Sequence, residues 1–277
     1  MKKLFIVKVV GRGVKIFCFV VAMGIHLFLS WSCTPAQCIS WPEGGTALGG
    51  SDFFRQAASM GWKSRDSLAV RAILDGNVPP FLKRFKRIRV SVADSISGQA
   101  IWAQYYVSKD YISVGNREDW VRVPLTPMAA QQLADTLDCF LPTRKIVDDV
   151  WAQAAVRLEP VPMYAFRDSS VTMWHHHLII EGQRKGRRGL IAGIKKDVVL
   201  SKTPRPDRVA IYGWHKPDGK PIQPLYVGHV NWYVDYSHGV RLVWKRVKVH
   251  VPGGGSRWMA YSEVLRDTRL RPLLCDE

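Results

Sequence analysis

Residues 190–243 most constrain the fold, because they form short apolar runs separated by turn residues. Runs rich in valine, isoleucine and aromatic residues, bounded by turns such as Pro217-Asp218-Gly219, are typical of β-strands. Rigid strands hold reactive side chains and loops expose them, so sites are often assembled at strand ends. The stretch therefore predicts a β-rich half with a polar site. Its reactive residues are Lys195, Lys196, Asp197, His215, His229, Asp235, Ser237, His238 and Arg241.

The preceding residues predict both helices and antiparallel strands. Alternation over residues 87–92 is typical of a half-buried strand, and residues 101–107 and 111–114 predict two more. Helices are expected where a capping residue precedes an apolar run. These positions are after Ser64, from Thr126-Pro127 to about Cys139, after Thr143, over residues 168–187 and near Ser262. The prediction is a single compact α+β domain, with a mixed or mainly antiparallel sheet and flanking helices.

The N-terminal residues predict an export signal over residues 1–33. Basic residues precede an apolar run of about 14 residues, 16–29, which is shorter than the ~20 residues of a membrane-spanning helix. Residues 29–33 are similar to a lipoprotein signal ending at Cys33, whereas Thr34-Pro35-Ala36 would suit ordinary cleavage, and a retained anchor is a third alternative. The chain is thus expected to be exported, as an inner- or outer-membrane lipoprotein or as a periplasmic or secreted protein.

The Gly- and Pro-containing residues 34–50 predict a flexible tether, with the globular domain over residues 51–277. The net charge is +17, and removal of residues 1–32 takes away five basic residues and no acidic one, which leaves +12. Anionic glycans, phospholipids and extracellular nucleic acid are the candidate partners of such a chain. The charge is dispersed, with local density at residues 83–89 and 184–188, and gives no strong nucleic-acid signal. Membrane association is expected only through the N-terminal lipid or signal.

Three cysteines would remain in the mature chain: Cys38, Cys139 and Cys275. One disulfide could form among them in an oxidising compartment, but the sequence does not select the pair. Cys139 is expected at the end of an apolar helix, where burial would raise the pKa of its thiol. Inert packing or a disulfide is therefore favoured over a nucleophilic role.

Five segments occur in order along the chain: LPTRKIVDDVW (141–151), KKDVVLS (195–201), RVAIYGWH (208–215), KPIQPL (220–225) and VDYSHGVRLV (234–243). At these segments the chain resembles a family of secreted bacterial proteins to which no activity is assigned. The resemblance covers roughly residues 65–277. It implies export and brings no reaction with it.

The segment Ser237-His238-Gly239-Val240-Arg241 also resembles the serine-histidine-glycine-cysteine-isoleucine-arginine signature of L,D-transpeptidases. That signature implies cross-linking of peptidoglycan through its cysteine. Here Val240 follows the glycine, so the thiolate nucleophile of that mechanism is absent. The resemblance therefore implies an inactive or rewired relative.

Asp235 and His238 are the sharpest catalytic candidates. Three residues apart on a bent segment, they could converge, so that the carboxylate orients an acid–base imidazole or both groups bind one metal. With His215 and His229 they would form a three-histidine, one-carboxylate set that suits zinc, although the spacing matches no zinc-hydrolase motif. Structural hydrogen bonding in turns is the alternative interpretation, and the cofactor stays unknown.

Three further residues complete the predicted site. Lys196, in Lys195-Lys196-Asp197, and Arg241 would hold a carboxylate or phosphate of the substrate. The alternative is that the lysines and Asp197 form an ordinary ion pair in a surface turn. His176 is the member of the 175–177 histidine tract expected to face the site, and a surface position of the tract is the alternative.

These residues lead to two main functional hypotheses, and a secreted nuclease is a third, which no recognised motif supports. The first is an exported cell-envelope hydrolase acting on a cell-wall-type peptide or glycan. The second is a non-catalytic, envelope-tethered binding module for an anionic glycan or peptidoglycan. Aromatic residues among the site residues suit stacking on sugars or peptides in both cases, and equally suit a β-sheet core.

Overall fold

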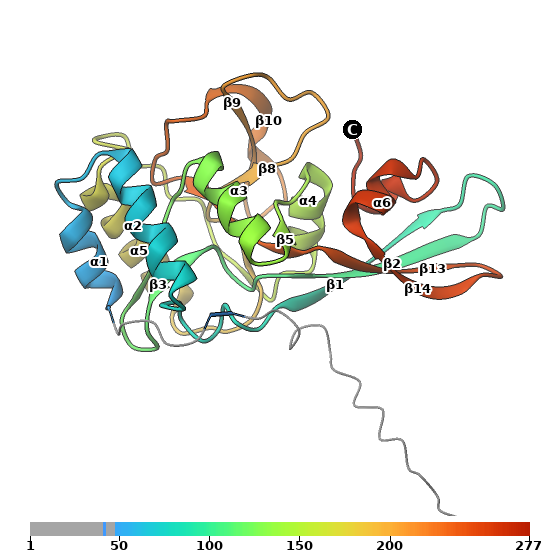
Figure 1. Ribbon diagram of the computed structural model, residues 1–277, viewed down its shortest axis with the longest axis horizontal. Coiled ribbons are helices and arrows are strands. Elements are labelled where there is room, and N and C mark those ends of the chain that lie inside the picture. Colours follow the sequence, from blue (N-terminus) through green and yellow to red (C-terminus); the bar gives the residue numbers. More distant parts are fainter. Residues whose placement is uncertain (1–40, 43–47) are drawn as a thin grey trace, which may run out of the picture. The chain divides into compact units, whose positions relative to one another are not determined.

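The computed structural model describes residues 41–42 and 48–277, which belong to one unit, residues 33–277. The predicted signal, its alternative cleavage sites and Cys38 lie outside the described residues. No helix in the described part of the chain is long and apolar enough to span a membrane. Within the described residues the fold is α+β, as predicted, with six α-helices and mostly antiparallel sheets (Figure 1).

The six helices of residues 48–277 are interspersed with the strands. Their bounds are α1 Gly50–Ala57, α2 Trp62–Leu74, α3 Pro127–Thr136, α4 Arg144–Ala152, α5 Ser170–Arg184 and α6 Tyr261–Arg266, followed by a 3-10 turn Arg271–Leu273. Helices α1, α2 and α5 lie side by side, and α2 also packs on α3 (Figure 1).

The largest sheet has six strands and is built mainly from two hairpins. Its order is β14-β13-β2-β12-β5, with β1 pairing on β2. The strands are β1 Lys86–Ala93, β2 Ala100–Val107, β5 Cys139–Phe140, β12 Val243–Trp244, β13 Arg246–Val251 and β14 Gly255–Ala260. Ile88 and Val90 of β1 are buried while their neighbours are exposed, which confirms the predicted half-buried strand.

A second sheet, of four strands, carries the residues predicted to form the site. Its order is β10-β9-β8-β11, from β8 Lys196–Val199, β9 Arg208–His215, β10 Pro221–Val230 and β11 His238–Gly239. Only the β8–β11 pair in it is parallel. Two small pairs complete the described strands: antiparallel β3 Ser113–Gly115 with β4 Trp120–Arg122, and parallel β6 Val156–Arg157 with β7 Ile191–Ala192.

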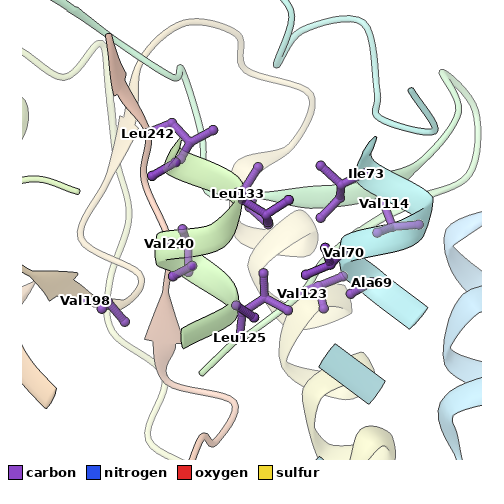
Figure 2. Packing of buried hydrophobic residues seen from close by; sticks show 14 of the residues in the cluster. Ala69, Val70, Ile73, Val114, Val123, Leu125, Leu133, Val198, Val240 and Leu242 are labelled. Atoms are coloured by element: carbon purple, nitrogen blue, oxygen red, sulfur yellow. The ribbon is translucent and has the colours of Figure 1, made fainter. Parts of the chain in front are cut away.

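The main hydrophobic core joins the helices to the second sheet. Figure 2 shows side chains of α2 and α3 meeting residues of β3 and β8 and of the segment after β11. Leu133 of α3 and Ile73 of α2 are completely buried there, and so are Val114 of β3 and Val240. Burying a side chain of this size contributes about 1.5–3 kcal/mol, so this core fixes the sheet relative to the helices.

The predicted tether is not wholly free of the domain. Trp41 is buried in the main core, and the Asn77 side-chain amide donates to the Leu48 carbonyl. Gly50 already belongs to α1, and its backbone N–H donates to the Asp119 carbonyl. A Cβ on Gly50 would lie 2.5 Å from the Trp120 backbone. The glycines at this end of the segment therefore serve close packing rather than flexibility.

Two predicted helix boundaries are wrong. Helix α2 starts at Trp62 rather than after Ser64, because Gly61 is extended and its carbonyl accepts from the Arg65 N–H. Helix α3 ends at Thr136, and Cys139 lies in β5, where it pairs with Trp244. Pairing with a strand more than 100 residues away is not visible in local sequence periodicity.

The predicted caps of α3 and α4 are confirmed. The Thr126 hydroxyl accepts from the Ala129 N–H, and the Thr143 hydroxyl accepts from the Ile146 N–H while donating to the Leu274 carbonyl. Both threonines are buried.

Thr143→Ala should therefore lower the free energy of unfolding by about 1–2 kcal/mol, since it removes a cap and leaves a buried carbonyl unpaired. Urea unfolding followed by circular dichroism measures this. Thr136→Ala, at the exposed end of α3, is the matched control and should change stability by less than about 0.5 kcal/mol. Equal effects of the two substitutions would contradict the prediction.

Candidate functional site

The parallel pairing of β8 with β11 assembles the site. Its register places His238 beside Lys196 and Gly239 beside Asp197. Paired residues project to the same face of a sheet, whereas successive residues alternate, so Lys196 and His238 share one face. A Cβ on Gly239 would lie 2.5 Å from the Tyr111 ring and 2.7 Å from the Lys195 Cβ, so glycine is required for this close approach.

Asp235 is held at the turn before β11. Its Oδ1 accepts hydrogen bonds from the Ser237 N–H (2.8 Å) and the Ser237 hydroxyl (2.6 Å), and its Oδ2 lies 2.9 Å from the Arg167 guanidinium. Burial acts to raise the pKa of Asp235, but His238, Ser237 and Arg167 together hold it below its usual value. Asp235 is therefore an ionised turn anchor, and the fully buried Ser237 hydroxyl is committed to it.

His238 is oriented differently from the predicted acid–base arrangement. Its Nδ1 accepts from the backbone N–H of Asp235 at 2.9 Å, while the Asp235 carboxylate stays 3.4 Å away. Burial lowers the pKa of His238 and keeps the ring neutral. An accepting Nδ1 leaves the hydrogen on Nε2, and this buried Nε2 has no partner among the described residues. The ring thus presents an unused N–H donor.

Lys196 and His229 complete this group. The pKa of Lys196 is lowered by burial, with Asp235 acting to raise it and Arg167 to lower it further, and its Nζ lies 5.3 Å from the centre of the Trp214 ring. The His229 ring meets that of His238 edge to face at 5.2 Å. We refer to Lys196, His229, Asp235 and His238 as the His238 cluster.

The backbone is strained beside this cluster. Trp214 has φ +59°, a conformation that bulky residues rarely adopt, directly after Gly213 at φ +105°. Gly213 pairs with Lys196 across β8 and β9. Strain of this kind costs on the order of 1–3 kcal/mol and is often found at functional sites. Here it presents the face of the Trp214 ring to Lys196.

His215 does not join the cluster in the manner predicted. Its Nε2 lies 2.8 Å from Oδ1 of Asp148 on α4, which also accepts from the Tyr212 hydroxyl. Its ring stacks on Trp151 of the same helix. In the described part of the chain, no group of three or more His, Cys, Asp or Glu residues is arranged to hold a metal ion. The structure therefore does not bring the four predicted residues together as a zinc set, because Asp148 of α4 is the hydrogen-bond partner of His215.

Arg241 was predicted to hold substrate, but it is only 1% exposed. Its guanidinium donates to the carbonyls of Ser108 and Ile191 at 2.7 Å and lies over the Tyr111 ring at 4.4 Å. All these partners come from distant segments. Arg241 is therefore a structural residue that joins three parts of the chain.

His176 lies inside the protein, as predicted, but beside Lys195 rather than Lys196. Its Nδ1 is 3.4 Å from the Lys195 ammonium, which also donates to the Tyr236 carbonyl. Burial, reinforced by Lys195, lowers the pKa of His176 well below its usual value. Burial also lowers the pKa of Lys195 to about 7. Of the two adjacent lysines, the sequence favoured Lys196, whereas Lys195 is the one completely enclosed.

Asp197 lies on the opposite face of β8 from the His238 cluster. The Tyr111 hydroxyl donates to its Oδ2 at 2.9 Å, and Oδ1 has no hydrogen-bond partner in the described residues. Burial raises the pKa of Asp197 to about 6 despite Arg241.

The two cysteines in the described part of the chain, Cys139 and Cys275, are buried free thiols. Burial raises the pKa of the Cys139 thiol. The expected raised thiol pKa is confirmed.

Sequence reasoning missed several polar residues that complete these contacts. Arg167 precedes α5, and Asp148 lies within α4, which the sequence analysis identified from its capping threonine. Each acts on a residue more than 60 positions away, so no local spacing could identify it. The helical spacing of the apolar residues in α4 leaves Asp148 on its more exposed side, which is a weak local signal.

Comparison of the chain with protein-family models, curated proteins and solved structures finds no match.

Proposed function

We propose that this chain is an exported cell-envelope protein that binds a wall-type peptide or glycan at the His238 cluster, through a carboxylate or carbonyl oxygen of the ligand. The observation that carries the proposal is the Nε2–H of His238, which has no partner among the described residues and lies on the same face of the sheet as Lys196. A buried donor without a partner costs about 1–3 kcal/mol. A ligand oxygen that accepts from both groups removes that cost.

Aromatic side chains extend the proposed binding face. Trp232 is 51% exposed and packs edge to face on Tyr233, whose ring in turn lies 6.3 Å from that of His238. Tyr226 on β10 is 50% exposed. Exposed rings beside polar donors suit the apolar faces of sugars and peptide side chains.

Hydrolysis of the bound ligand is the second candidate function, and one observation favours it. The lowered pKa of Lys196 increases the fraction of neutral amine available as a general base. The adjacent Nε2–H of His238 would then stabilise a developing oxyanion. In this arrangement Lys196 is the base and His238 the donor, which reverses the acid–base role predicted for His238.

His238→Ala and Lys196→Ala should each weaken binding to insoluble peptidoglycan by roughly 10- to 100-fold, because each removes a hydrogen bond that involves a buried or charged group. Co-sedimentation of the purified protein measures the affinity, and urea unfolding confirms that the variants are folded. His250→Ala and Lys202→Ala, both exposed and outside the cluster, are the matched controls.

The same samples separate the two candidate functions. Release of soluble fragments by the wild type, lost in both cluster variants, supports the hydrolase. Co-sedimentation of the wild type with peptidoglycan, without release of soluble fragments, supports binding alone. If folded cluster variants sediment like their controls and the wild type releases nothing, the His238 cluster is not the functional site.

A further inference from the structure

A second candidate site lies in a cavity of about 350 Å³ whose lining residues are all outside the His238 cluster. The loop before β1 supplies Arg84, the second residue after β2 is Lys109, and the β3–β4 turn supplies Arg117. The end of α5 and the residues after it supply Arg184 and Arg188. Four segments of the chain thus bring five cationic side chains to one cavity.

The cavity holds almost no compensating negative charge. Asp110 is the only carboxylate that lines it, and both of its oxygens accept from Arg122, at 2.9 and 2.7 Å. Glu181 does not line the cavity, and it pairs with Arg122 and Arg184. Within residues 41–42 and 48–277, the other four cations form no ion pair.

These cations act on one another. The pKa of Lys109 is lowered by burial and further by the neighbouring charges of Arg84 and Lys86. Like charges gathered in a partly enclosed space repel, and folding tolerates this only at a cost. A multiply charged anion in the cavity would convert the repulsion into attraction.

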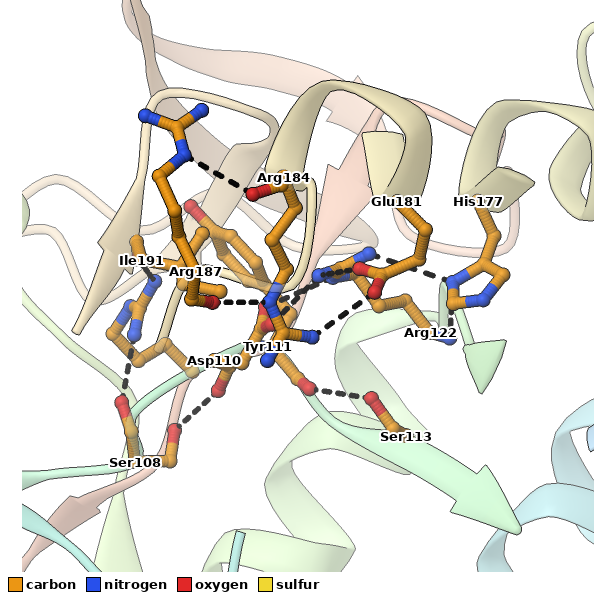
Figure 3. Close-up of polar contacts among 11 residues, drawn as sticks. Ser108, Asp110, Tyr111, Ser113, Arg122, His177, Glu181, Arg184, Arg187 and Ile191 are labelled. Carbon is orange, nitrogen blue, oxygen red and sulfur yellow. Dashed lines mark hydrogen bonds and ion pairs between the residues drawn. The ribbon is translucent and has the colours of Figure 1, made fainter. Parts of the chain in front are cut away.

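The C-terminus of α5 does not oppose an anion at this place. The last carbonyls of a helix carry partial negative charge, but the Arg187 guanidinium donates to the carbonyl of Arg184 (Figure 3). It also donates to the carbonyl of Gln183. The Arg184 guanidinium is held by Glu181 and by the Arg187 carbonyl, at 3.0 and 2.8 Å. Arg187 therefore neutralises the helix end, and Arg184 is fixed in place at the cavity.

One wall of the cavity is aromatic. The rings of Phe81 and Trp120 meet edge to face at 4.7 Å, and the Arg184 guanidinium lies 5.8 and 5.5 Å from their centres. Both rings line the cavity. The cavity therefore combines a rigid apolar wall with a cationic rim.

We propose that this cavity binds a phosphate-ester ligand, with its phosphate group on the arginine rim and its organic part against Phe81 and Trp120. Arginine guanidinium groups match phosphate oxygens in planar, paired geometry. Four cations without ion pairs suit a group of two or more negative charges better than a single carboxylate. The phosphate could belong to a soluble molecule or to a lipid head group, since the recognised chemistry is the same.

The test measures pyrophosphate binding to the full-length protein by titration calorimetry, and compares Arg84→Ala/Arg117→Ala with Arg246→Ala/Arg257→Ala. Both pairs are exposed and lower the net charge equally, but the second pair lies on β13 and β14. The first double variant should weaken binding about 10-fold or more, since two charge-assisted contacts are lost. The control should change it less than about 3-fold, through long-range charge alone.

A second arm identifies the source of the phosphate. Phosphatidylglycerol vesicles are compared with phosphatidylcholine vesicles in a flotation assay of the same three proteins. If the protein binds the anionic vesicles and only Arg84→Ala/Arg117→Ala abolishes this binding, the cavity is assigned to a lipid head group. If the protein binds pyrophosphate but not the vesicles, the cavity is assigned to a soluble phosphate ester. Equal losses in the two double variants, or no binding of either probe by the wild type, would overturn the proposal.

Discussion

Arg122→Met should lower the free energy of unfolding by about 3–5 kcal/mol, because it leaves a buried carboxylate without its partner. Arg122 and Asp110 are each only 1% exposed, and Glu181 accepts a further hydrogen bond from Arg122 at 2.8 Å (Figure 3). Burial acts to raise the pKa of Asp110, and Arg122 holds it below its usual value. Urea unfolding at pH 7.5 measures the loss.

Two further variants separate this effect from loss of packing. Arg184→Met removes a more exposed ion pair with Glu181 and should cost less than about 1 kcal/mol. Arg122→Met/Asp110→Asn removes the orphaned charge and should recover part of the loss. A single Arg122→Met variant within 1 kcal/mol of the wild type, or a double variant less stable than the single one, would show that the buried pair contributes little.

Lowering the pH from 7.5 to 5.5 should destabilise the protein by roughly 4 kcal/mol, because three buried histidines are neutral in the folded state and take up protons on unfolding. The pKa of His176 is lowered by burial and Lys195, that of His177 by burial and Arg122, and that of His238 by burial. In the unfolded chain each pKa is near 6.5. Their stabilisation is therefore present above pH 6.5 and is lost as the pH falls below it.

Two other buried groups change the free energy of unfolding in opposite directions between pH 7.5 and 5.5. Lys195, with a folded pKa of about 7, binds more protons when unfolded and adds to the loss. Asp197, with a folded pKa of about 6, gains a proton in the folded state as the pH falls and offsets less than about 1 kcal/mol. The two contributions nearly cancel, so the histidines dominate.

His176→Gln isolates one of the three protons. The difference in unfolding free energy between pH 7.5 and 5.5 should shrink by about 1.4 kcal/mol, whatever the substitution does to stability at pH 7.5. His250→Gln, exposed on β13, should leave the difference unchanged. An identical pH dependence in the wild type and His176→Gln would show that His176 is not enclosed as described.

Local sequence patterns predicted most of the secondary structure because the forces that set it act over short distances. The alternation of β1, the threonine caps of α3 and α4, and the turn between β9 and β10 each depend on residues a few positions apart. Two of the errors arose where a distant segment decided the outcome. Cys139 is in a strand because β12 pairs with it, and the segment before α1 is packed because Trp41 enters the core.

The candidate site divides in the same way. The density of reactive residues in the sequence indicated Lys196, His229, Asp235 and His238. The fold brings these four together through the β8–β11 pairing. The sequence could not separate them from His215, Arg241 and His176, because all seven are polar residues near predicted strands. Their roles follow from partners that only the tertiary structure supplies: Asp148 for His215, two backbone carbonyls for Arg241, and Lys195 for His176.

The sequence by itself determined that this chain forms an α+β domain and that reactive side chains gather in residues 190–243, since propensity, capping and composition are local properties. Only the tertiary structure decided which of those side chains are buried, which keep a free donor, and where unpaired cations meet in a cavity. Burial and partnership are set by segments distant in sequence, and they fix the charge state of a group through desolvation and nearby charges. The same histidine type is therefore a structural contact at position 215 and a candidate ligand donor at position 238.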